Sequence, residues 1–242
     1  MFPCWHSRGK WKHNLERRTC FKHNCKIRNF SRSPKECIRN NRNHRLARRF
    51  LQKGHRLEST VTFRSKFELS EAIPHIKDGP KDVSIIENLC LRPERNQRSF
   101  PDLIELTPEE GIKGDRWLKS PWLTLKNGKP DPGIQVSILS KRVWDAVKFG
   151  PEAIHPGDTF MSDFDTSEEN CPTGTILEAG TAKLKVSGIF NEGCVKWKVR
   201  YGADAKNWIT LEENKPLRLR GLLCAVISAG QIRNGDLLKK IS

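Results

Sequence analysis

Short apolar runs separated by turn residues dominate the chain from residue 83 onward. They predict strands over residues 83–91, 103–106, 134–139, 181–190, 217–228 and 236–241. Turns between these runs contain glycine followed by aspartate, where glycine supplies a positive φ and aspartate accepts bonds from the following amides. Three such pairs stand in the sequence: Gly114-Asp115, Gly157-Asp158 and Gly235-Asp236.

One helix is predicted by apolar residues at three- and four-residue spacing. Ser140 has the character of an N-cap, and Val143, Trp144 and Val147 follow it on one face, which indicates a helix over residues 140–149. Helical crossovers are missing between most of the predicted strands. The pattern therefore favours a mainly β fold, a closed or partly closed β-barrel with a few short helices, over a parallel α/β sheet.

Residues 1–66 lack this pattern and carry the excess charge. The chain of 242 residues has a formal net charge of +16, and this segment holds only three acidic residues among its many Lys and Arg. We expect a basic arm of low order over residues 1–66, a linker over 67–82 and the folded domain over 83–242. The folded part is close to neutral, so nucleic-acid binding is expected only through the arm, if at all.

The basic arm has several interpretations. A solvated tail without a specific role is the leading one. Its Arg-rich, acid-poor composition is also that of a mitochondrial presequence, although it has no clear amphipathic stripe. A cationic arm also attracts the phosphates of RNA or of a membrane surface. Zinc binding would use Cys20, His23, Cys25 and Cys37, but their spacing matches no standard ligand set.

The start of the chain and its cysteine content point to a reducing compartment. The opening residues contain no apolar core of a secretory signal, and nowhere are there about 20 consecutive apolar residues that would form a membrane span. We therefore expect free thiols and a cytoplasmic location, or a mitochondrial one if the arm is a presequence.

Cys194 is the candidate for chemistry. It lies among three cations and two aromatic rings in the stretch GCVKWKVRYG, residues 193–202. Neighbouring positive charge stabilises a thiolate, which is both a nucleophile and a metal ligand. The stretch fits a strand with alternating faces and also a helix with Cys194, Trp197 and Tyr201 on one side. Cys90 and Cys224 lie in apolar runs, where packing in the core explains them.

The order of several short motifs resembles the MOSC domain, named from the C-terminal region of molybdenum cofactor sulfurases. The resemblance covers residues 83–242 and depends on the sequence of motifs around one central cysteine. In chain order these are Arg92-Pro93, Gly114-Asp115-Arg116-Trp117, residues 135–139 before the helix, His155-Pro156-Gly157-Asp158, residues 170–175, residues 193–202, Arg218-Leu219-Arg220-Gly221 and residues 230–236. The resemblance implies a strand-rich barrel, with Cys194 as the residue that ligates molybdenum or carries sulfur.

The same resemblance implies which residues would hold the molybdenum cofactor, molybdopterin. Its phosphate requires cations or clustered N–H groups. The candidates are Arg92, Arg116, Lys196, Arg200 and Arg220, each of which could instead form a structural ion pair. Asn170 matches an asparagine that can bond a pterin edge. Trp117 and Trp197 are candidates for the pocket wall, although core packing is the commoner use of such rings.

One departure from the family pattern precedes the cysteine. Asn191-Glu192 stand where the resembled family carries His-Thr, so if that histidine is a proton donor in the family, this chain lacks it and could be a slower or altered enzyme. The chain also has no iron–sulfur, haem or dinucleotide motif, so any reductase activity needs an external electron donor.

Three functions remain open at this stage. The leading one is oxo- or sulfur-transfer or reductase chemistry on a small molecule at a Cys194-ligated molybdenum. The second is a sulfur carrier in which Cys194 holds a persulfide supplied by a donor protein. The third is a non-catalytic cofactor-binding or scaffold module. The Pro-, Gly- and Lys-rich stretch 118–132 is either a lid or a surface loop.

Overall fold

Seven strands close into a barrel in the computed structural model, which describes residues 63–242. Around the barrel the order is β1 (Val83–Glu87), β10 (Leu237–Lys240), β6 (Ile176–Ala179), β7 (Ala182–Val186), β8 (Leu222–Ser228), β4 (Val136–Ser140) and β5 (Phe160–Ser162). The pair β4–β5 is parallel and the other pairs are antiparallel. The barrel predicted from the sequence is confirmed. The predictions made for residues 1–62 lie outside the described residues.

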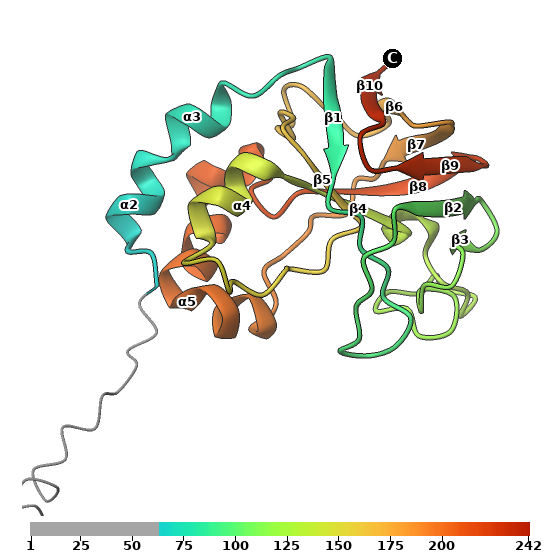
Figure 1. Ribbon diagram of the computed structural model, residues 1–242, viewed down its shortest axis with the longest axis horizontal. Helices are drawn as coiled ribbons and strands as arrows, with labels where there is room; N and C mark the ends of the chain where they lie inside the picture. Colours follow the sequence, from blue (N-terminus) through green and yellow to red (C-terminus); the bar gives the residue numbers. More distant parts are fainter. Residues whose placement is uncertain (1–62) are drawn as a thin grey trace, which may run out of the picture. The chain divides into compact units, whose positions relative to one another are not determined.

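A three-stranded sheet stands beside the barrel, in the order β3 (Gly111–Ile112), β2 (Leu103–Thr107) and β9 (Gly230–Arg233). Only Ala229 separates β8 from β9, so the chain passes directly from barrel to sheet (Figure 1). Gly230 makes this passage possible, because a Cβ there would lie 2.4 Å from the backbone nitrogen of Ala182.

The helices gather on one side of the barrel (Figure 1). They are α2 (Lys66–Glu71), α3 (Ile73–Lys77), α4 (Lys141–Val147) and α5 (Val195–Thr210). Of two 3₁₀ segments, η2 (Glu212–Leu217) contacts α5, whereas η1 (Pro132–Ile134) contacts β8. Within residues 63–242, no helix combines the length and the apolar character that crossing a bilayer requires.

Of three clusters of buried residues in the described part of the chain, two follow this division, and the third is small and contains Trp117, Ile134 and Leu223. The first fills the barrel with alternate residues of its strands, as in β7, where Ala182, Leu184 and Val186 point inward. The second lies between the helices and the barrel wall and contains Trp197 and Trp208 of α5. Residues 67–82, expected to be a linker, contain α3 and all of α2 except its first residue, Lys66, and Leu69 and Ile76 of these helices belong to this second cluster.

The helix predicted over residues 140–149 is present as α4. Ser140 is its N-cap residue, but the hydroxyl makes no capping bond and has no hydrogen-bond partner. The stretch after Cys194 forms the helix α5, which settles the choice between helix and strand. Each glycine of the three Gly-Asp turns has a positive φ, as predicted.

Candidate functional site

Cys194 is the residue immediately before α5. Its backbone is extended, and its carbonyl accepts hydrogen bonds from the amides of Trp197 and Lys198, so it begins the helix. Its side chain is exposed and makes no capping bond. The thiol therefore stands at the surface on a fixed backbone position.

The burial pattern explains why this stretch is a helix. Trp197 and Tyr201, four residues apart, are each 2 % exposed, whereas Val195 and Val199 are each 71 % exposed. A strand would place all four on one face, but a helix separates the aromatic pair from the valines. The rings of Trp197 and Tyr201 pack edge to face at 4.6 Å. Gly202 then bends the helix with a φ of 94°.

α5 is joined to the loop that contains the motif His155-Pro156-Gly157-Asp158. The Tyr201 hydroxyl donates a hydrogen bond to the carbonyl of Ile154 at 2.5 Å. From the preceding residue of the helix, Arg200 Nη1 donates to the carbonyl of Pro156 at 3.0 Å. The first two turns of α5 thus hold this loop next to the segment that begins with Cys194.

Three arginines surround the loop, and we call Arg98, Arg200 and Arg220 the arginine cluster. Arg98 Nη2 donates to the Pro156 carbonyl at 3.5 Å, beside Arg200. Arg220 Nη1 bonds both carboxylate oxygens of Asp158, at 2.7 and 2.8 Å. Burial, and then the charge of Arg200, lower the pKa of Arg98. Positive charge is therefore in excess here, with Asp158 as the carboxylate paired to Arg220.

Buried donors without partners concentrate at this loop. In the described part of the chain, five buried side-chain polar atoms lack a hydrogen-bond partner, and three of them are Arg98 Nε, His155 Nε2 and Arg220 Nε. Buried polar groups are normally bonded, so three such donors at one loop make it a candidate site for an acceptor. Gly157 leaves room for Arg98, because a Cβ there would lie 3.0 Å from Arg98 Nε.

His155 acts in this site as a neutral donor. Its Nδ1 accepts a hydrogen bond from the Gly157 amide at 3.1 Å, which places the proton on Nε2. Burial lowers its pKa from 6.5 to about 4; Asp158 opposes the shift and the three arginines add to it. At neutral pH the imidazole therefore offers an uncharged N–H.

Arg220 connects the arginine cluster with the cysteine segment. Its guanidinium carbon lies 4.7 Å from the centre of the Trp197 ring, and its backbone carbonyl accepts a bond from Asn191 Nδ2 at 2.8 Å. Asn191 and Trp197 each stand three residues from Cys194, on either side of it. Contacts with Arg220 thus hold both flanks of the Gly193-Cys194 pair.

The structure places the other predicted cofactor residues differently. Lys196 Nζ donates to Asn96 Oδ1 at 2.6 Å, which ties it to the segment that leads to Arg98. Arg92 Nε pairs with the buried carboxylate of Asp115 at 3.0 Å. Arg116 donates to the Ser120 carbonyl at 3.4 Å. Of the arginines named as candidates, only Arg200 and Arg220 belong to the arginine cluster.

Asn170 lies in a separate network. Its amide nitrogen donates to the carbonyls of Lys81 and Asp165, and its amide oxygen accepts from Lys240 Nζ at 2.6 Å. Trp117 is also built into the fold, because its Nε1 donates to the carbonyl of Asp131, within the predicted lid or loop 118–132. Both side chains use their polar groups on the protein itself.

No role was assigned from the sequence to three residues of this site: Arg98, His155 and Asp158. The motif 155–158 signals the loop, since it combines a histidine, an aspartate and a Gly that needs a positive φ. Arg98 stands in a polar stretch with no periodicity, and nothing in the sequence distinguishes it from Arg95.

The four described cysteines divide by exposure. Cys90, Cys171 and Cys224 are fully buried, whereas Cys194 is exposed. Burial raises the pKa of Cys90 and of Cys171 to about 11, and raises that of Cys224 further. The prediction that Cys90 and Cys224 serve packing is confirmed by their place in the core. Among residues 63–242, no group of three or more His, Cys, Asp and Glu side chains could hold a metal ion.

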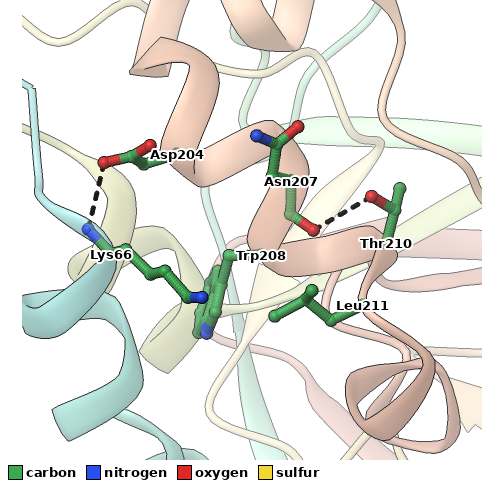
Figure 2. Close-up of a pocket in the computed structure, with 6 residues that line it drawn as sticks. All are labelled: Lys66, Asp204, Asn207, Trp208, Thr210 and Leu211. Atoms are coloured by element: carbon green, nitrogen blue, oxygen red, sulfur yellow. Dashed lines mark hydrogen bonds between the residues drawn. The ribbon is translucent and has the colours of Figure 1, made fainter.

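A pocket of about 390 Å³ lies between the start of α2 and the C-terminal half of α5. Figure 2 shows its lining, in which the Lys66 side chain extends toward the Trp208 ring and the Lys66 amide bonds Asp204. None of the predicted site residues lines this pocket. It is therefore distinct from the loop that the arginine cluster surrounds.

Comparisons with known proteins give structural similarities alone. No family model matches the chain, and no curated protein matches it. YuaD from Bacillus subtilis is similar with 19 % identity and a TM-score of 0.47, over 65 % of this chain and 95 % of that one. YiiM from Escherichia coli is similar with 18 % identity and a TM-score of 0.44, over 66 % of this chain and 70 % of that one. At these values the comparisons establish no function for this chain.

Proposed function

We propose that residues 83–242 bind a phosphorylated cofactor of the molybdopterin type, with Cys194 as the protein ligand of its molybdenum. The observation that carries this proposal is the group of three buried, unpartnered N–H donors around Gly157, next to the segment of Cys194. The MOSC resemblance suggests the cofactor class, and these three donors are of the kind that its phosphate would need.

The residues of the site fit an anionic group. A phosphate accepts several hydrogen bonds, and donors that are already charged bind it most strongly. Arg98 Nε and Arg220 Nε supply charged donors, and His155 Nε2 supplies a neutral one. Asp158 holds Arg220 through Nη1 and leaves its Nε free. A net positive charge therefore remains for the ligand.

Cys194 fits the role of metal ligand. Its thiol is exposed, and thiolate is a soft donor suited to a thiophilic metal. A molybdenum centre bound there would supply exchange of an oxygen atom and of two electrons with a small substrate. The chain itself would orient the cofactor through the arginine cluster and hold the cysteine at a fixed position. A separate protein would supply the electrons.

Metal and pterin analysis tests this proposal. The full chain is purified from a host that makes the molybdenum cofactor, beside Cys194→Ser, Arg98→Met and the control Arg142→Met. Arg142 pairs with Asp163, a carboxylate outside the arginine cluster. We expect molybdenum and pterin in the wild type and the control, less molybdenum in Cys194→Ser, and loss of both in Arg98→Met. Absence of molybdenum and pterin from the wild type overturns the proposal.

A sulfur carrier is the second candidate function, because Cys194 alone among the described cysteines is exposed. In that reaction the Cys194 thiolate attacks the outer sulfur of a donor persulfide, takes that sulfur, and releases the donor thiolate. Incubation with a cysteine desulfurase and cysteine, followed by peptide mass mapping, detects one added sulfur on Cys194. If neither metal nor persulfide is found, the barrel is a binding or scaffold module.

A further inference from the structure

The outer face of the first two turns of α5 is apolar at its centre and basic at its edges. Val195 and Val199 stand one turn apart, each 71 % exposed. The 100° rotation per residue places exposed Lys198 on one side of this pair and exposed Lys196 on the other. No acidic residue occurs between Cys194 and Tyr201. We call Val195, Lys196, Lys198 and Val199 the α5 face.

Further exposed apolar side chains adjoin the same site. Ile154, whose carbonyl accepts the Tyr201 hydroxyl bond, is 57 % exposed. Phe100 is 59 % exposed and packs edge-on against the His155 ring at 5.1 Å. Single exposed apolar residues are common on protein surfaces, but several around one functional loop indicate an interaction surface.

We propose that the α5 face, together with Ile154 and Phe100, is the docking surface for an acidic electron-carrier protein. The inference rests on the proposed function, since it assigns the partner of that same site. The α5 face begins at the residue after Cys194, so a carrier docked on it brings its redox group next to the thiol. Its basic edges complement an acidic rim, and its small apolar centre suits a transient complex.

The partner supplies what the reaction consumes. Reductive removal of one oxygen atom from a substrate takes two electrons and two protons and releases water. A one-electron carrier is oxidised twice in each turnover, and a two-electron carrier once. Rapid exchange of oxidised for reduced carrier requires weak binding, which a small face of this kind provides.

Direct binding measurements test the α5 face without reference to turnover. The full chain is titrated calorimetrically with a [2Fe–2S] ferredoxin and with a flavodoxin, two small acidic electron carriers, at low and at moderate salt. We expect micromolar affinity for at least one carrier at low salt, weakened about tenfold as salt screens the charges.

Matched variants localise the binding. Lys198→Glu and Val199→Glu change the α5 face without touching the arginine cluster or Cys194, and each should weaken binding about tenfold. Lys183→Glu and Val83→Glu are the controls; they lie on strands β7 and β1, and Val83 is 47 % exposed. They should leave the affinity unchanged.

The outcomes separate this inference from the proposed function. If the protein binds molybdenum that dithionite can reduce, but neither carrier binds, the docking surface is wrong and the cofactor proposal stands. If a carrier binds the α5 face and no molybdenum is found, the cofactor proposal fails alone. The docking surface is also wrong if the control variants lose as much carrier affinity as the α5-face variants. It is wrong as well if the chain self-associates and Val199→Glu abolishes this, because the face is then an interface between two copies of the chain.

Discussion

Replacing Asp158 with asparagine tests whether the arginine cluster is built around excess positive charge. The Asp158 side chain is 1 % exposed, and both of its oxygens accept bonds from Arg220 Nη1. Asparagine keeps the size of the side chain but removes its charge. Arg220, 13 % exposed, then remains near Arg98 and Arg200 without its carboxylate partner.

The expected loss of stability is large. Removing one partner of a buried ion pair costs about 3–5 kcal/mol. The asparagine oxygen still accepts one bond, so we expect the low end, about 3 kcal/mol, in the free energy of unfolding. Urea titration followed by tryptophan fluorescence measures it. Asp163→Asn is the control, because Asp163 pairs with Arg142 and is 43 % exposed; its loss should stay below about 1 kcal/mol.

Phosphate should rescue the variant. An anion bound by the cluster replaces the missing negative charge, and ten millimolar phosphate with a dissociation constant of about 1 mM returns about 1.4 kcal/mol. We expect a smaller gain in the wild type, where Asp158 already balances Arg220. Equal losses in Asp158→Asn and Asp163→Asn would refute this reasoning, as would an equal response of both proteins to phosphate.

Three further predictions concern the same loop and the thiols. Because burial holds the pKa of His155 at about 4 against 6.5 in the unfolded chain, its contribution to stability is complete above pH 6.5 and declines as the pH falls toward 4. Because His155 is partly exposed, the loss in the free energy of unfolding between pH 7 and pH 5 is limited to about 1–2 kcal/mol. Urea titrations at pH 7 and 5 should show this loss in the wild type, and His155→Gln should not show it. Gly157→Ala should lose more stability, by the same method, than Gly128→Ala, because both glycines have a positive φ but only Gly157 has a neighbour at 3.0 Å. Iodoacetamide at pH 8, read by peptide mass mapping, should modify Cys194 before buried Cys90, Cys171 and Cys224; similar rates at all four would contradict their burial.

The barrel could be predicted because five of its seven strands lie within apolar or alternating stretches bounded by turn residues. Four strands were missed, β3, β5, β6 and β9, and they have only two to four residues each. A segment such as Phe160–Ser162 is too short to show a period, and its pairing with β4 and β1 decides its conformation. Tertiary pairing rather than local sequence therefore determines these elements.

The site could be predicted only in part, because its residues come together from separate segments. Alternation alone could not exclude a strand after Cys194, since valine favours strands and nothing local shows that Val195 and Val199 face outward. Arg92 and Arg220 look alike in sequence, each next to a motif. Their partners, Asp115 and Asp158, are distant in the chain. Arg92 bonds Asp115 through Nε, whereas Arg220 bonds Asp158 through Nη1 and its Nε has no partner.

Asn191 has a structural role through its contact with Arg220. A histidine at position 191 would lack an amide that donates to the Arg220 carbonyl in the present geometry, and that bond helps fix the arginine beside Trp197. An imidazole N–H is nevertheless present in the site, contributed by His155 from the opposite segment. With a pKa of about 4, His155 carries no spare proton at neutral pH. It can donate a hydrogen bond to a bound anion, but in the proposed reductive reaction it would not be a proton donor at neutral pH.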